Sequence, residues 1–232
     1  MQPFEVGGIV ALNAPVLCLD TCSLLDMMRD PTRDTVREPE RRAIYDLLTA
    51  AEGRAAVITL VADQVVTEFG EHVDEVEKEA AKALQKLRDE LARIDAVAAA
   101  YGSGGPTDIS HLDDHVTRAR GIVDRWFAAA TPAAQAGHIP ANAWRRVSQA
   151  RTPARKGKDS MKDCVVVETY LDVVGALRGA GLQSKVVFVS SNKKDYAGET
   201  GSTLKPDLAA DFAPLSMEYA PNMGAAKHLL GL

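Results

Sequence analysis

The 232-residue sequence lacks the features of several large protein classes. Its apolar runs all fall short of the roughly 20 residues that a membrane-spanning helix needs. The N-terminus has no basic start followed by a long apolar segment, so it does not resemble a signal peptide. Aromatic residues make up 5% of the chain, which is few for a surface that stacks on bases. We therefore expect a cytoplasmic protein with no membrane partner.

Cysteine is scarce, and the common phosphate-binding loop is absent. Cys18, Cys22 and Cys164 form an odd set, which argues against a disulfide framework and favours a reducing compartment. No histidine lies near them in the sequence, so a zinc site built on these thiols is not expected. The segment "YGSGGPT" (101–107) lacks the glycine and Lys-Ser/Thr spacing of a P-loop.

The composition that remains is that of a globular protein with a sizeable core, with 46% hydrophobic and 25% charged residues. Three apolar, β-branched runs predict buried strands, and a fourth run is a weaker candidate; they lie at 16–20, 56–61, 186–190 and 213–217. Helical patterns alternate with them, at 23–28, 39–51, 63 to about 100, and 111 to about 130. This alternation predicts an α/β fold, a three-layer α/β/α sandwich with a mostly parallel central sheet.

The middle of the chain differs from its two ends. An apolar stripe with spacings of three and four predicts one long helix; it comprises Val73, Val76, Ala80, Leu84, Leu87, Leu91 and Ile94. We interpret residues 71–151 as a helical insertion within a single domain that spans 1–232. A coiled-coil partner helix is the alternative, although the stripe lasts for only about three heptads.

Acidic residues lie at or after the ends of the three stronger strand candidates. Asp20 ends the first run, Glu68 follows the second and Asp195 follows the third, while Asp163 begins the helical pattern before the third run. Ligand sites in open parallel sheets form outside the carboxyl ends of the strands, so these side chains should converge. Four carboxylates about 5 Å apart repel one another by roughly 3 kcal/mol per pair at an effective dielectric constant near 20.

A divalent cation would compensate this repulsion, and oxygen-only ligands suit Mg²⁺ or Mn²⁺. Such a cluster can hold one or two metals that activate water and stabilise the leaving oxygen in phosphodiester cleavage. Each acid also has a structural interpretation: Asp20 as a helix N-cap, Asp163 as a partner of a helix dipole, and Glu68 as a solvated helix residue. The five histidines lie outside these segments, so histidine acid–base catalysis is not expected.

The four segments resemble the motifs of the PIN-domain nucleases. They read "LDTCSLLD", "VVTEF", "KDSMKDCVVVETYL" and "VFVSSNKKDY". The resemblance implies a metal-dependent endoribonuclease in which Asp20, Glu68, Asp163 and Asp195 bind Mg²⁺ or Mn²⁺. It implies that Thr21 or Ser23 orients the first carboxylate or a metal water and that Asn192 supports the fourth corner. Asn192 stands where many members have an acid, so either it or Asp195 contacts the metal, and Asp159 and Glu168 are spare acids near the third motif.

The net charge of −5 requires that any nucleic-acid contact be a local basic patch. Residues 145–162 carry seven cations, Arg146 among them, and a single acid. We expect the substrate phosphates to bind the cations nearest the motifs, which are Arg155, Lys156, Lys158, Lys162, Lys193 and Lys194. The alternative is a solvated loop.

Other functions remain open at this stage. A phosphohydrolase that forms an aspartyl phosphate at Asp20 would need a second Asp two residues later, where the chain has Cys22. A non-catalytic module with the same fold could serve as a scaffold through its long charged helix. The sequence does not distinguish RNA from DNA as substrate, or an antitoxin from a second copy of the chain as partner.

Overall fold

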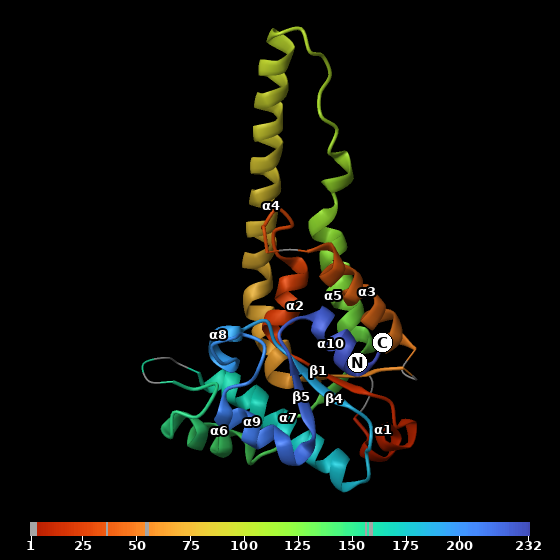
Figure 1. The fold of residues 1–232 in the computed structure, drawn as a ribbon, viewed down its shortest axis with the longest axis vertical. Helices are drawn as coiled ribbons and strands as arrows, with labels where there is room; N and C mark the ends of the chain where they lie inside the picture. Colours follow the sequence, from red (N-terminus) through yellow and green to blue (C-terminus); the bar gives the residue numbers. More distant parts are fainter. Residues whose placement is uncertain (1–3, 36, 54–55, 156, 158–159) are drawn as a thin grey trace.

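A five-stranded, all-parallel sheet forms the centre of the molecule (Figure 1). The computed structural model describes residues 4–35, 37–53, 56–155, 157 and 160–232. The strand order is β3-β2-β1-β4-β5. The strands are β1 (Val16–Leu19), β2 (Ile58–Ala62), β3 (Thr131–Ala133), β4 (Val186–Val189) and β5 (Met217–Ala220).

The register brings the carboxyl ends of the inner strands level with one another. Leu19 of β1 lies opposite Val61 of β2 on one side and Val189 of β4 on the other. These strands are buried along their whole length, as expected for a sheet covered on both faces. The residues that follow β1, β2 and β4 therefore emerge along one edge of the sheet.

The three stronger strand predictions are confirmed to within two residues at each end, whereas the weaker one, placed near 213–217, shares only Met217 with the observed strand. Residues 213–217 hold the 3₁₀ helix η2 (Ala213–Leu215), and β5 begins only at Met217. The sequence reading also missed β3, which lies within the stretch expected to be helical. This strand has three residues, one of them Pro132, and it sits at the edge of the sheet, where a missing N–H donor is tolerated.

Helices cover both faces of the sheet, which confirms the three-layer α/β/α sandwich. One face carries α2 (Thr21–Met28), α3 (Glu38–Glu52), α5 (His115–Ala129) and α10 (Met223–Leu230). The other carries α1 (Val6–Leu12), α7 (Met161–Gly179), α9 (Pro206–Phe212) and η2. This division follows from right-handed crossovers, because the chain moves outward from β1 to β3 and then returns to β4 and β5. The remaining short helices are η1 (Ser110–Leu112), α6 (Ile139–Ser148) and α8 (Lys193–Tyr196).

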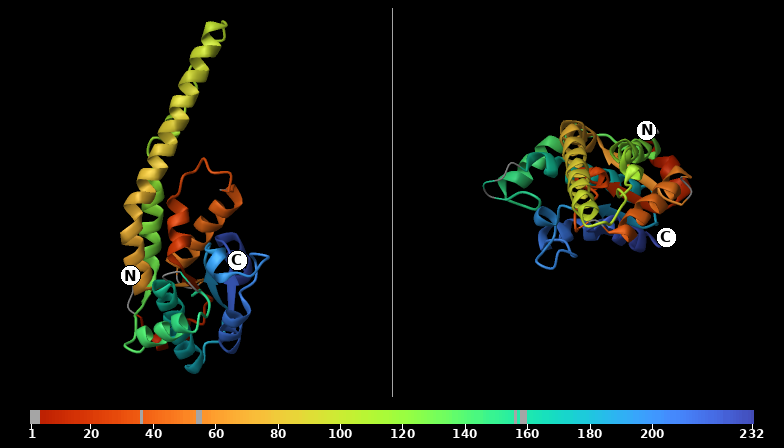
Figure 2. Two further views of the ribbon diagram at one scale, coloured as in Figure 1. Left: turned by 90° about the vertical axis from the view of Figure 1, so that its left-hand side faces the viewer. Right: turned by 90° about the horizontal axis from the view of Figure 1, so that it is seen from above.

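Helix α4 (Asp63–Ala100) starts at the sheet and projects far beyond it (Figure 2). Its 38 residues correspond to a length of about 57 Å. The buried side chains of its apolar stripe end at Leu84, whereas Ile94 and Val97 are each 56% exposed. The first half of the stripe thus packs within its own chain, mainly against α2. Neither α4 nor any other helix in the described residues is long and apolar enough to span a membrane.

Tyr170 of α7 fastens this helix to the carboxyl ends of two strands. Its buried hydroxyl donates a hydrogen bond to the carbonyl of Leu19 and accepts one from the N–H of Ala62, at 3.1 Å. Asp163 lies seven residues earlier, two turns along the same face of the helix. The tyrosine therefore holds the first turn of α7 over the edge at which the strands end.

We predict that Tyr170→Phe lowers the free energy of unfolding by about 1–3 kcal/mol, because a buried backbone N–H and C=O both lose their partner. Urea denaturation would measure the change. Tyr45→Phe, on an exposed position of α3, is the matched control and should change stability by less than about 0.5 kcal/mol. Equal stabilities for the two variants would show that the tyrosine does not fasten α7.

Candidate functional site

The site lies at the topological switch point of the sheet. The chain leaves β1 toward β2 and β3 on one side and later fills β4 and β5 on the other, so a crevice opens between the carboxyl ends of β1 and β4. Asp20 directly follows β1 and Ser190 directly follows β4. The Ser190 hydroxyl donates a 2.6 Å hydrogen bond to Oδ2 of Asp20, and both residues are buried.

Asp20 occupies the N-cap position of α2, but its carboxylate makes no capping hydrogen bond. The structural interpretation of Asp20 as a helix cap therefore does not account for it. Burial, the largest cause, and the negative charges of Asp163 and Glu68 together raise its pKa from 3.8 to about 7, against the lowering effect of the hydrogen bond from Ser190. The ionised form of Asp20 is thus destabilised both by burial and by its acidic neighbours.

Glu68 lies in the second turn of α4 and is tied to α2. The Thr21 hydroxyl donates a 2.8 Å hydrogen bond to Oε2 of Glu68. Burial is the main cause that raises the pKa of Glu68, and the charge of Asp163 adds to it. Thr21 was expected to orient Asp20 or a metal water, but it contacts the carboxylate of Glu68. The Ser23 hydroxyl donates a 3.4 Å hydrogen bond to the carbonyl of Val189.

Asp195 forms a separate corner at the same end of the sheet. It is buried in α8, where Asn192 Nδ2 donates a 2.7 Å hydrogen bond to its Oδ2. Arg155 Nε lies 3.4 Å from the other carboxylate oxygen. Asn192 therefore contacts the fourth carboxylate as expected, and Arg155, expected to bind substrate, is paired with an acid.

A cavity of about 380 Å³ opens beside α4 and is predominantly acidic. Its walls include Glu68 and Asp163, with Arg29 as the single Lys or Arg among the described residues that line it. Three further polar side chains come from the same face of α4, namely His72, Glu75 and Glu79. Counted from Glu68, these residues follow one another at spacings of four, three and four, which places all of them on one face of the helix. The sequence analysis interpreted this pattern only as a charged surface.

The donor chemistry fits a hard divalent cation, although the described part of the chain forms no ready-made ligand cage. Among the described residues, no group of three or more His, Cys, Asp or Glu side chains has the spacing to hold a metal ion. Asp20, Glu68 and Asp195 each accept a hydrogen bond from a neighbouring hydroxyl or amide, as ligating carboxylates commonly do. Oxygen-only donors that raise one another's pKa are nevertheless the set that a hard cation stabilises.

Tyr196 carries a buried polar group that lacks a hydrogen-bond partner among the described residues. Its side chain is fully buried, and its hydroxyl finds no hydrogen-bond partner in the part of the chain that the structure describes. Burial raises its pKa well above 10, and the charges of Asp20 and Asp163 contribute to this rise. Tyr196 is therefore a neutral hydrogen-bond donor within electrostatic reach of the carboxylates, and the sequence reading had assigned it no role.

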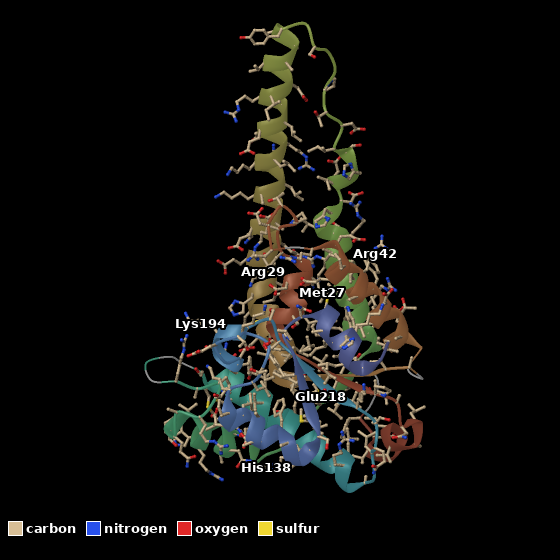
Figure 3. All side chains as sticks on the ribbon, viewed as in Figure 1. Met27, Arg29, Arg42, His138, Lys194 and Glu218 are labelled. Atoms are coloured by element: carbon tan, nitrogen blue, oxygen red, sulfur yellow. The ribbon has the colours of Figure 1, made fainter. Side chains whose placement is uncertain are left out.

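The cations of the basic segment divide into several groups. Lys162 pairs with Glu71 of α4, and Lys193 and Lys194 are exposed on α8, where Figure 3 labels Lys194. Lys156 and Lys158 lie outside the described residues, as does Asp159. Glu168, the other spare acid, accepts a hydrogen bond from Arg146 at 2.7 Å, so both are engaged in an ion pair that joins α6 to α7.

Comparison with known proteins gives one match. A family model described as "PIN domain" matches residues 17–196, more than half of the chain. This range begins in β1 and ends at α8, so it includes all four acidic segments. No curated protein matches the chain, and no solved structure matches it.

The pKa of Asp20 predicts a pH dependence of stability in metal-free protein. An acid whose folded pKa lies above its unfolded value binds more protons when folded, so stability falls as pH rises between 3.8 and about 7. At about 1.4 kcal/mol per pKa unit, the full loss is on the order of 4 kcal/mol at pH 8.

Urea unfolding in EDTA at pH 5 and pH 8 would measure the part of this loss that falls above pH 5, about 2.7 kcal/mol. Asp20→Asn removes the titrating group, so the variant should lose markedly less stability than the parent protein over the same interval. An identical pH dependence in both proteins would contradict the assignment of Asp20 as a strained carboxylate.

Proposed function

The chain belongs to the PIN-domain family, and on this premise we propose that it is an endoribonuclease that hydrolyses phosphodiester bonds with Mg²⁺ or Mn²⁺. Members of this family are generally nucleases that use divalent metals. The observation that carries the proposal is the approach of Asp20, Glu68 and Asp163, whose charges raise the pKa of Asp20. These three acids come from three separate elements, Asp20 from the N-cap of α2, Glu68 from α4 and Asp163 from the first turn of α7.

In the proposed mechanism, the metal would be held by Asp20, Glu68 and Asp163. Asp195 would add a fourth carboxylate at the same end of the sheet. A bound divalent cation supplies Lewis-acid activation of water and charge compensation at the leaving oxygen. The neighbouring hydroxyls fix the carboxylates: Ser190 orients Asp20 and Thr21 orients Glu68.

The substrate side is formed by cations close to these acids. Arg155 lies beside Asp195, and Lys193 and Lys194 lie on the same short helix as that carboxylate. Their positive charges would bind the phosphates that flank the scissile bond, against the overall charge of −5. We propose RNA as the substrate, and a matched DNA strand in the same assay distinguishes the two nucleic acids. The three unpaired cysteines support a reducing, cytoplasmic setting.

We predict that Asp20→Asn and Asp163→Asn each reduce cleavage of single-stranded RNA in Mn²⁺ by at least about 100-fold, since each removes a metal ligand. The measurement is the initial rate with a 5′-labelled oligonucleotide. Asp172→Asn is the matched control, because Asp172 also lies on α7 but is exposed and pairs with His138. Parent-like rates in both Asp20→Asn and Asp163→Asn would disprove the catalytic assignment.

A non-catalytic scaffold of the same fold is the second candidate. The observation in its favour is the absence of a ready-made metal cage among the described residues, together with the pairing of Asp195 by Arg155. Such a module would use the projecting half of α4, where Ile94, Val97 and Tyr101 are exposed.

Metal binding separates the two candidates without a substrate. We predict that Mn²⁺ stabilises the protein by about 2.7 kcal/mol at a hundredfold excess over its dissociation constant. The melting temperature should therefore rise during a Mn²⁺ titration, and the rise should be lost in Asp163→Asn and retained in Asp172→Asn. A melting temperature that does not respond to Mn²⁺ or Mg²⁺ would favour the scaffold.

A further inference from the structure

A second cavity, of about 340 Å³, lies on the other side of α2 from the acidic one. Its walls come from α2, the loop after it, α3, α8 and the first residue of α10. Its volume lies within the range of small-molecule sites. The apolar part of the wall is formed by Met27, Ile44 and Met223. Figure 3 labels Met27 and Arg29 on this side of the molecule.

The charge of this cavity is opposite to that of the acidic one. Four cations line it, Arg29, Arg33, Arg41 and Lys193, against the two acids Asp26 and Glu40. They come from three parts of the chain, the loop after α2, α3 and α8, and acids are interspersed with the arginines of the first two, so no basic run marks the site. This local excess of cations is opposite in sign to the net charge of −5.

The guanidinium groups are only partly neutralised by the acids beside them. Arg29 Nε lies 2.7 Å from Asp26 Oδ1, yet this N–H makes no well-aligned hydrogen bond among the described residues. Arg41 is half-buried; burial lowers its pKa and the charge of Arg33 lowers it further, whereas Asp26 and Glu40 raise it. An anion bound in the cavity would therefore favour the charged form of the half-buried Arg41.

The two cavities share helix α2 as a wall. Thr21, Cys22 and Leu25 face the acidic cavity, whereas Ser23, Asp26 and Met27 face the basic one. Arg29 lines both. Ser191, in the wall of the basic cavity, directly follows the serine that holds Asp20. A chain of phosphates could therefore lie across the end of α2 with one phosphate on each side.

We propose that the basic cavity binds the phosphate of one nucleotide of the substrate strand, next to the nucleotide that is cleaved. Arg29, Arg33, Arg41 and Lys193 contact the phosphate, and the base or ribose packs on Met27, Ile44 and Met223. The placement on a substrate strand rests on the proposed function, whereas phosphate binding by the cavity stands on its own charges and shape.

The test is a binding titration of the full chain in EDTA, so that no turnover occurs. Isothermal calorimetry with AMP, adenosine and inorganic phosphate compares the whole nucleotide with its two parts. AMP should bind, and adenosine and inorganic phosphate should each bind at least about tenfold more weakly, a difference of about 1.4 kcal/mol. Adenosine or phosphate binding as tightly as AMP would overturn the nucleotide assignment.

Two variants and a matched control identify the cavity. Arg41→Gln and Arg33→Gln should each weaken AMP binding about tenfold. Arg42→Gln makes the same change at the next position of α3, where Arg42 is exposed, pairs with Glu38 and lies outside the cavity, so binding should stay within about twofold of the parent protein. Arg33 is exposed, so its substitution leaves the fold intact even if that of Arg41 does not. Equal affinities in Arg33→Gln, Arg42→Gln and the parent protein would overturn the site.

A 5′-hydroxyl pentaadenylate places the site on a strand, because it contains only phosphodiesters. It should displace AMP in the same EDTA buffer, and a failure to compete would overturn the placement beside the scissile bond. If AMP binds as expected but RNA is not cleaved by the parent protein in Mn²⁺, the proposed function fails while phosphate binding by the cavity stands.

Discussion

A buried carboxylate at the carboxyl end of the central strand is the main physical constraint on this molecule, because its ionised form must be stabilised. Asp20 is 2% exposed, and the one side-chain donor recorded for it is the hydroxyl of Ser190 on the neighbouring strand. Burial and two acidic neighbours oppose its ionisation. A protein designed only for stability would place an apolar residue or a paired cation there. The cost is understandable if an ion from outside the chain completes the site.

The sheet itself provides the alignment that this site requires. Because β1, β2 and β4 end level with one another, the segments that follow them begin at one edge. Tyr170 then fixes α7, which arrives from the opposite face, to the ends of β1 and β2. The acids whose charges act on Asp20 lie 48 and 143 positions away along the chain, and the strand register, the Tyr170 hydroxyl and the hydrogen bond from Thr21 to Glu68 position the elements that carry them.

The sequence predicted the strands and the positions of the acids because both are local signals. Buried parallel strands are continuous apolar runs, and an acid at the end of such a run stands out, as Asp20 does after Val16–Leu19. It could not predict β3, whose three residues include a proline, or the partner of Thr21, which depends on how α4 packs against α2. The role of Ser190 was equally hidden, since its partner lies 170 residues away.

Charge was the least predictable property. The basic run at 145–162 looked like one surface, yet Arg146 is 4% exposed and is held by Glu168 and Asp211. The basic cavity, by contrast, is assembled from three parts of the chain, in two of which acids are interspersed with the arginines. Whether an arginine is solvated, paired or directed into a cavity depends on residues far away in the sequence, so a count of cations along the chain cannot locate a phosphate site.

The long helix α4 also has a mechanical consequence. Glu68 and Leu84, the last buried residue of its stripe, are about 24 Å apart along the axis, and this stretch is clamped by the core. The next 26 Å or so, up to Tyr101, contain no fully buried residue, and their contacts include the ion pair of Arg88 with Asp113. We therefore expect a sideways load on the free end to bend the helix above Leu84, while the buried stretch that follows Glu68 stays held by the core.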